Sequence, residues 1–130
     1  MMQAGQAMKI TEAESHVMGV LWEKSPLDGE AIAAHLKEQA WSRTTVRTLL
    51  ARLVQKGAVA QTKAAGRLDQ FAPLIGHADY AHEQSRNLID RVFGGKVSPL
   101  FAQLAEREDL TPQDIAELKA LIGKIEDDRR

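Results

Sequence analysis

Residues 41–57, WSRTTVRTLLARLVQKG, constrain the fold of this chain more than any other stretch. On a helical wheel their apolar side chains fall within about 140° of arc, which predicts an amphipathic helix with one buried face. These side chains are Val46, Leu49, Leu50, Leu53 and Val54. Ser42 can cap this helix at its N-terminus, with Trp41 packed beside the cap as a hydrophobic staple, and Gly57 can end it. The rest of the chain must supply a core for this apolar face.

The opposite face of this predicted helix is hydroxylated and basic. Its members are Thr44, Thr48 and Gln55, with Arg47 and Arg52 at the edges and Arg43 in the first turn. A helix of this kind fits the major groove of DNA, where Arg reads guanine and Thr contacts a phosphate or a thymine methyl group. A solvated face with several arginines is also common on proteins that bind no nucleic acid. Residues 41–57 alone therefore leave both interpretations open.

The charge distribution along the chain favours the interpretation that this face binds DNA. The net charge is −1, but residues 1–75 carry nine basic and seven acidic residues, whereas residues 76–130 carry eight basic and eleven acidic ones. Residues 42–67 contain six basic residues and no acidic residue. Attraction of phosphate depends on the basic residues at the contact, and the global charge matters little. The N-terminal part of the chain is therefore the candidate nucleic-acid binder.

Several other functions are disfavoured by the composition. The chain has no cysteine, which excludes thiolate metal sites and cysteine nucleophiles. His77, Asp79, His82 and Glu83 cluster, but the spacing of the two histidines suits one helical face poorly, so we expect neither a metal nor another cofactor. No catalytic constellation or phosphate-binding loop is evident, so we expect no enzyme. Without a signal peptide or a long apolar run, we expect a cytoplasmic protein with no membrane contact of its own.

Two further helices are predicted before residue 41. Thr11 and Glu14 form a capping box for the first helix, which should run to about residue 24, before Pro26. Leu27 is expected to form a short extended bridge. Asp28 can then cap a second helix that ends near residue 39. The three helices should pack as one compact unit.

A polar, alternating segment after the third helix predicts a β-hairpin. Leu68 and Phe71 begin its return strand, which Pro73 stops. Lys63 and Arg67 flank the tip, where they can follow a phosphate backbone. An ordinary surface hairpin is the alternative. Three helices followed by a basic hairpin nevertheless match the order of a winged helix.

The C-terminal part, residues 76–130, predicts three amphipathic helices at about 77–93, 97–105 and 111–125. Gly94-Gly95 forms a turn between the first two, and Thr111-Pro112 starts the last. So small a unit cannot bury this much apolar surface alone, which favours pairing of two copies over the alternative of a tail folded back onto residues 1–75. The expected dimerisation residues are Leu88, Val92, Phe93, Leu100, Phe101, Leu104, Leu118, Leu121 and Ile122.

Three segments carry a resemblance to a known family. ITEAESHVMGVLWEKSPLDGEAIAAHL, WSRTTVRTLLARLVQKGAV and RVFGGKVSPLFAQLAEREDLTPQDIAELKALI resemble the penicillinase repressors of BlaI/MecI/CopY type. The resemblance spans residues 10–122. It implies a mainly α protein, with a winged helix-turn-helix DNA-binding domain at 1–75 whose hairpin is the wing, and a helical dimerisation domain at 76–130. The implied function is that of a homodimeric repressor of a palindromic operator in double-stranded DNA. The alternative is a winged-helix protein-interaction module without DNA binding.

The family's DNA-facing positions can be transferred residue by residue. They fall on Ser42, Arg43, Thr44, Thr45, Arg47, Thr48 and Arg52, with support from Lys63 and Arg67 in the wing. Arg47 and Thr48 fill their family positions, so they rank first for base readout. The family often has Pro-Lys where this chain has Arg43-Thr44, a departure that affects base preference.

The resemblance also implies a route of release from DNA. In one branch a membrane sensor metallopeptidase triggers cleavage of the repressor at an Asn-Phe bond in the dimerisation helices. The aligned bond here is Gln103-Leu104, which departs from that pattern. Cleavage there would still separate two dimerisation helices. The copper-responsive branch uses paired cysteines, which this chain lacks, so a copper-thiolate switch is excluded.

Overall fold

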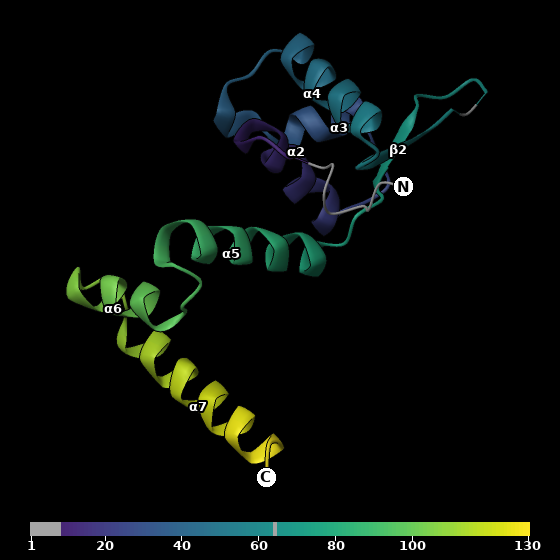
Figure 1. Cartoon of the computed structure of the whole chain (residues 1–130). Coiled ribbons are helices and arrows are strands. Elements are labelled where there is room, and N and C mark those ends of the chain that lie inside the picture. The colour runs from purple at the N-terminus through teal and green to yellow at the C-terminus, as the bar shows by residue number, and fades with distance from the viewer. Residues whose placement is uncertain (1–8, 64) are drawn as a thin grey trace. The chain divides into compact units, whose positions relative to one another are not determined.

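The computed structural model describes residues 9–63 and 65–130, and it is mainly helical with one small sheet (Figure 1). In chain order the elements are α2 (Glu12–Glu23), β1 (Leu27–Asp28), α3 (Gly29–His35), the 3₁₀ turn η1 (Lys37–Gln39), α4 (Arg43–Lys56), β2 (Val59–Thr62), β3 (Gln70–Pro73), α5 (His77–Phe93), α6 (Ser98–Glu106) and α7 (Pro112–Asp128). The chain divides into two compact units. The first ends at Glu83 and the second is Gln84–Arg130, so α5 begins in one and ends in the other.

Local capping fixes the start of α2. The backbone N–H of Glu14 donates to Oγ1 of Thr11 at 3.1 Å, and the backbone N–H of Thr11 donates to Oε1 of Glu14 at 2.9 Å. This reciprocal pair is the predicted capping box, and it satisfies two N–H groups that an uncapped helix leaves free. The helix ends at Glu23, with Lys24 as its C-cap, as predicted.

The second helix is shorter than predicted. Asp28 caps α3 by accepting a hydrogen bond of 2.8 Å from the N–H of Ala31, as expected. The α-helix stops at His35, however, and the 3₁₀ turn η1 continues the chain to Gln39. Leu36 leaves the helical region with a ψ of 23°, and its side chain is buried. Burial of this leucine in a tighter turn thus replaces the last predicted turn of α-helix.

The core of the first unit lies between α2, α3, α4 and the start of β2. Its buried apolar residues are Val17, Met18, Leu21, Ile32, Leu36, Val46, Leu49, Leu50, Leu53, Ala58 and Val59. Trp41 is half-buried against this core, and its indole ring meets the His16 ring edge-on at a centroid distance of 5.9 Å. The predicted apolar face of residues 41–57 is therefore the one that packs inward.

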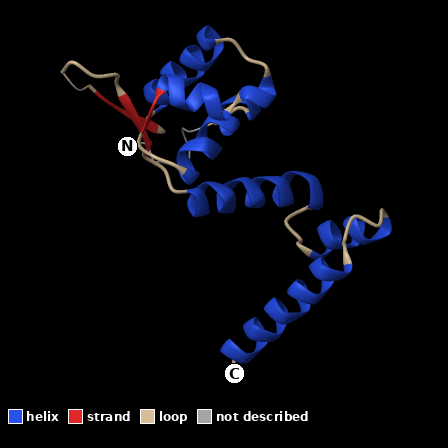
Figure 2. Ribbon diagram, turned by 180° about the vertical axis from the view of Figure 1, so that it is seen from behind, coloured by secondary structure: helices blue, strands red, loops and turns tan. Residues whose placement is uncertain are grey.

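The hairpin belongs to a three-stranded antiparallel sheet in the order β1-β3-β2. Figure 2 shows β2 and β3 extending beside the three helices of the first unit. The β2–β3 ladder ends at the pair Thr62↔Gln70, and β1 joins through the pair Leu27↔Phe71. The prediction that Leu68 begins the return strand is wrong. Leu68 lies in the loop beyond the last ladder pair, and it is 55% exposed.

In the second unit, local signals set the helix boundaries. Gly94 and Gly95 both have positive φ, which ends α5 and confirms the predicted turn. Thr111 and Asp114 form a capping box that starts α7, also as predicted. Between α6 and α7 the chain reverses through Glu108, whose φ is 60°. Across the described parts of the chain, no helix has the length and apolar character that crossing a membrane requires.

Candidate nucleic-acid interface

Helix α4 has one buried side and one exposed side. Val46, Leu50 and Leu53 are at most 2% exposed and fix the helix to the core. The opposite side, called the outer face of α4 below, consists of exposed residues: Arg43, Thr44, Arg47, Thr48, Ala51, Arg52 and Gln55. Sequence reasoning identified all of these except Ala51. A small residue in the middle of this face lets a flat surface approach the helix backbone.

Capping engages two of the predicted site residues. Oγ of Ser42 accepts a hydrogen bond from the backbone N–H of Thr45 at 3.1 Å and lies 3.1 Å from Oγ1 of Thr45. At the other end, Gly57 takes a left-handed conformation with a φ of 84°. The hydroxyl of Thr48 donates to the carbonyl of Thr44 at 2.9 Å, which leaves its lone pairs for an incoming donor. The helix is thus held at both ends.

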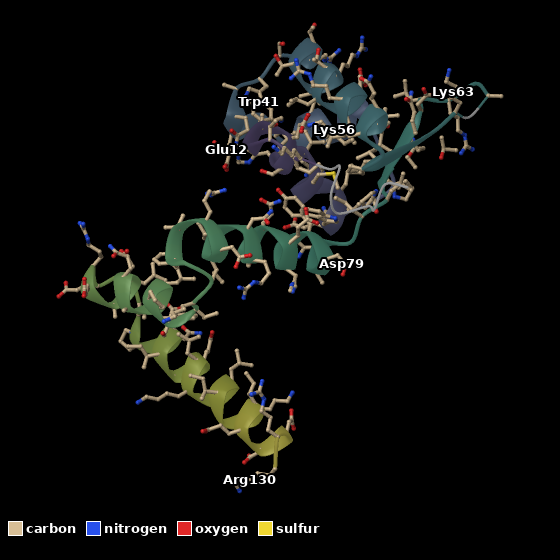
Figure 3. All side chains as sticks on the ribbon, viewed as in Figure 1. Glu12, Trp41, Lys56, Lys63, Asp79 and Arg130 are labelled. Carbon is tan, nitrogen blue, oxygen red and sulfur yellow. The ribbon has the colours of Figure 1, made fainter. Side chains whose placement is uncertain are left out.

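A cleft of about 450 Å³ lies between α3, α4 and the hairpin. Arg43 and Arg47 line it from α4, and Arg67 lines it from the hairpin loop. The structure therefore brings together three predicted site residues from two elements. Thr44, Thr48 and Arg52 do not line the cleft, and Lys63 lies farther along the hairpin (Figure 3). The predicted set thus comprises one arginine group around the cleft and other residues outside it.

Sequence reasoning did not identify the other polar residues that line the cleft. Glu30 comes from α3, and Gln61 and Asp69 come from the hairpin. The side-chain amide of Gln61 donates to Oδ2 of Asp69 at 2.6 Å, a bond that bridges the two arms of the hairpin. The local sequence pattern cannot bring these three residues together, because Glu30 lies in a helix and the other two lie in the hairpin. Their placement depends on the packing of the hairpin against α3 and α4.

Two of the six basic residues in the acid-free stretch 42–67 form ion pairs with acids outside that stretch. Nη1 of Arg43 lies 3.4 Å from Oε1 of Glu30, and Nζ of Lys56 lies 2.5 Å from Oε1 of Glu14. The other four basic residues have no ion pair within the described residues: Arg47, Arg52, Lys63 and Arg67. These four are the cations available to phosphate.

Glu14 is the buried anion behind the site. Its side chain is 1% exposed, and its Oε2 has no hydrogen-bond partner within the described residues. Burial raises the pKa of Glu14, but the hydrogen bond and positive charge of Lys56, together with the N–H and hydroxyl of Thr11, outweigh that effect. The pKa of Glu14 consequently lies below its ordinary value, and the carboxylate stays charged at neutral pH.

An aromatic group joins the start of α5 to α2 within the first unit. The indole N–H of Trp22 donates to the carbonyl of Ile75 at 2.9 Å, and the rings of His77 and Tyr80 lie 4.9 and 5.2 Å from the Trp22 ring. Burial, with Glu83 and Glu14 nearby, raises the pKa of Tyr80. His77 thus packs on an indole. Where the structure describes the chain, no group of three or more His, Asp or Glu side chains is placed to hold a metal ion.

The predicted dimerisation residues lie on helices α5, α6 and α7. Five are exposed: Leu88, Val92, Phe101, Leu121 and Ile122. The other four are half-buried: Phe93, Leu100, Leu104 and Leu118. Val97, Ile115 and Ile125 are further exposed apolar residues of the second unit. The candidate cleavage bond Gln103-Leu104 lies within α6, with Gln103 exposed and Leu104 half-buried.

The first unit is a winged-helix domain: two helices with a short strand between them, a third helix with an exposed basic side, and a β-hairpin. Residues 10–124 match the family model described as penicillinase repressor, and the chain belongs to that family. It is 32% identical over 117 residues to the methicillin resistance regulatory protein MecI of Staphylococcus aureus (strain N315), covering 89% of this chain and 94% of the relative. It is 30% identical over 115 residues to the penicillinase repressor of Bacillus licheniformis, covering 88% and 89%.

Two solved structures are similar to the first unit. The solution structure of the DNA-binding domain of the repressor BlaI aligns with a TM-score of 0.51 and 36% identity, over 62% of this chain and 94% of that one. The monomeric form of Bacillus licheniformis BlaI in complex with the blaP half-operator aligns with a TM-score of 0.50 and 34% identity, over 58% and 92%. The predicted fold class and family are therefore confirmed.

Proposed function

We propose that this chain is a transcriptional repressor that binds an inverted-repeat operator in double-stranded DNA as a homodimer. The observation that carries the proposal is the outer face of α4, where exposed arginines and threonines stand opposite the side that packs into the core. The basic hairpin beside it supplies further cations. Membership of the penicillinase repressor family, and a relative whose structure is a complex with a half-operator, support the same function. A cytoplasmic location belongs to this proposal.

Roles in DNA recognition follow from position on the two elements. Arg47 and Thr48, in the N-terminal half of α4, read base edges in the major groove, because the N-terminal residues of a recognition helix contact the bases. Arg52, Lys63 and Arg67 contact phosphates. Such contacts position the protein without reading sequence. The first turn supplies supports and phosphate contacts through Ser42, Thr44 and Thr45, whereas Arg43 beside them is paired with Glu30.

The proposed dimer uses the exposed apolar residues of the second unit. Leu121 and Ile122 are 54% and 55% exposed, and Val92 is 55% exposed, in the single chain. Large exposed apolar patches are rare on monomers and mark interaction surfaces. A two-fold dimer would bury them and set the distance between two recognition helices, which an inverted repeat requires. The domains proposed from the sequence, 1–75 for DNA and 76–130 for pairing, fit this division of labour.

Release from DNA is proposed to follow a signal-dependent event such as proteolysis at Gln103-Leu104, with a membrane sensor metallopeptidase as the candidate partner. Both residues are in helical conformation in α6, with the N–H of Asp109 donating to the carbonyl of Leu104 at 2.9 Å. Proteases bind extended chain, so α6 must open locally before cleavage. Such opening would disrupt the same apolar surface that pairs two copies.

The proposal is tested by selecting duplexes from a random-sequence pool with the full chain, then measuring mobility shifts of the selected duplex. An inverted repeat among the selected sequences, and binding that weakens steeply between two salt concentrations, are the expected results. Failure to retard any duplex at low salt would instead favour the winged-helix protein-interaction module. Selection of a single, unrepeated half-site would contradict the homodimeric mode while leaving DNA binding intact.

A further inference from the structure

The cleft beside α4 contains acids as well as arginines. Of the three arginines that line it, Arg43 alone is in an ion pair among the described residues. Its partner Glu30 stands in the first turn of α3, and both side chains are well exposed, at 76% for Arg43 and 58% for Glu30. An exposed pair of this kind adds little to stability. Because the Arg43–Glu30 pair lies on the candidate DNA face, it can instead affect DNA binding.

We infer that Glu30 is a specificity-determining residue, which withholds Arg43 from the phosphates of unrelated DNA. The inference rests on the proposed function. A phosphate that approaches Arg43 must either displace the Glu30 carboxylate or lie beside it, so the free energy gained from the contact is reduced. Glu30 thus removes about one cation from the set that neutralises phosphate. Unrelated DNA offers no base contacts that could offset the loss of this phosphate contact.

The effect should differ between cognate and unrelated DNA. On its operator the protein has one register, fixed by base contacts, and a freed Arg43 reaches a phosphate only if that register permits it. On unrelated DNA the protein settles wherever phosphate contacts are most numerous, since non-specific binding is essentially electrostatic. A freed Arg43 therefore benefits unrelated DNA more. The Glu30–Arg43 pair accordingly increases the ratio of the affinity for the operator to the affinity for unrelated DNA.

Glu30 also has an ordinary structural role that the test must separate. An acid in the first turn of a helix interacts favourably with the helix dipole. Glu12 occupies the first turn of α2 and does not line the cleft, so it offers a matched control. Glu30→Gln and Glu12→Gln remove the same charge from the first turns of two helices. A difference between the two variants in DNA binding reports the position of Glu30 in the cleft.

The experiment compares the full chain and its variants on the duplex selected from the random pool and on a scrambled duplex of the same length and composition. Glu30→Gln should tighten binding to the scrambled duplex roughly threefold to tenfold at low salt and steepen the salt dependence by about 0.9 in the log–log slope. Binding to the selected duplex should change less, and Glu12→Gln should change neither duplex. In an Arg43→Gln background, Glu30→Gln should have a smaller effect.

Three results would overturn the inference. The first is an equal change of affinity for the scrambled duplex in Glu30→Gln and Glu12→Gln. The second is a Glu30→Gln effect on that affinity that is the same with and without Arg43→Gln. The third is weaker binding of Glu30→Gln to the selected duplex. The last result would mean that Glu30 holds Arg43 in the orientation that the operator needs. Circular dichroism of each variant checks the fold. If the unaltered chain retards neither duplex, the proposed function itself fails, and that outcome precedes any comparison of variants.

Discussion

Lys56 donates a hydrogen bond of 2.5 Å from Nζ to Oε1 of the buried Glu14, and this pair joins the last turn of α4 to the first turn of α2. The same ammonium group donates to the carbonyl of Lys9 at 2.6 Å. One side chain therefore holds three points of the first unit together: the segment before α2, the capping box of α2 and the C-terminal end of α4. The orientation of α4 depends on this contact as well as on its leucines.

Replacement of Lys56 by Met should lower the free energy of unfolding by about 3 kcal/mol, because it leaves a buried carboxylate without its cation. The double variant Glu14→Gln, Lys56→Met should recover part of that loss, since no unpaired charge remains. Urea unfolding of the single and double variants measures both values. Equal stabilities of the Lys56→Met variant and the unaltered chain would show that the pair contributes nothing.

The pH dependence of the free energy of unfolding should show the contribution of the Glu14 carboxylate. Because its pKa in the folded chain lies below the ordinary value of 4.5, folding favours the charged form. Its contribution is complete above that ordinary pKa and is lost as the pH falls through the folded pKa. The free energy of unfolding should therefore decline in acid, and it should decline less steeply in Glu14→Gln. Parallel acid limbs of the two proteins, measured by urea unfolding, would contradict this assignment.

Arg47→Ala should weaken binding to the selected duplex by roughly 1 to 3 kcal/mol and relax the preference at one base position, because it removes a proposed base contact. Lys63→Ala, on the hairpin, should weaken binding to all duplexes alike and lower the salt slope by about 1. Titrations against a set of single-base variants of the selected duplex measure both effects. If Arg47→Ala loses the same affinity on selected and scrambled DNA, Arg47 contacts phosphate and does not read bases.

The features that sequence predicted well depend on neighbouring residues. The apolar stripe of α4, its cap at Ser42 and its left-handed end at Gly57 are all determined within a few residues, and the structure has each of them. The capping boxes at Thr11 and Thr111 are local in the same sense. Local signals of this type fix helix boundaries and the direction of the buried face before any tertiary contact exists.

The features that sequence missed depend on distant pairings. The extended bridge predicted at Leu27 is present as the two-residue strand β1, but its pairing with β3 could not be assigned from the sequence. The ion pair of Lys56 with Glu14 joins residues 42 positions apart, and that of Arg43 with Glu30 joins two different helices. A count along residues 42–67 gives six basic residues and no acid, whereas packing pairs two of the six with acids outside that stretch. Sequence therefore located the candidate DNA face but not its effective charge.

The second unit provides the test of pairing. Leu121 is 54% exposed on the apolar side of α7, and a glutamate there would place a charge in the proposed dimer interface. Leu121→Glu should therefore convert the protein to a monomer at micromolar concentration, as measured by analytical ultracentrifugation. It should also weaken binding to the full inverted repeat more than binding to a single half-site, because only the full repeat gains from two linked recognition helices.

Ala120→Glu is the matched control, because residue 120 faces away from that apolar stripe on a helical wheel and is also exposed. This variant adds the same charge one position away and should stay dimeric, with DNA binding unchanged. A monomer in both variants would indicate that charge on α7 is disruptive wherever it falls. A dimer in both would mean that the pairing surface lies elsewhere. Only loss of the dimer in Leu121→Glu alone assigns pairing to the apolar side of α7, since the two variants differ in the side of the helix that carries the charge.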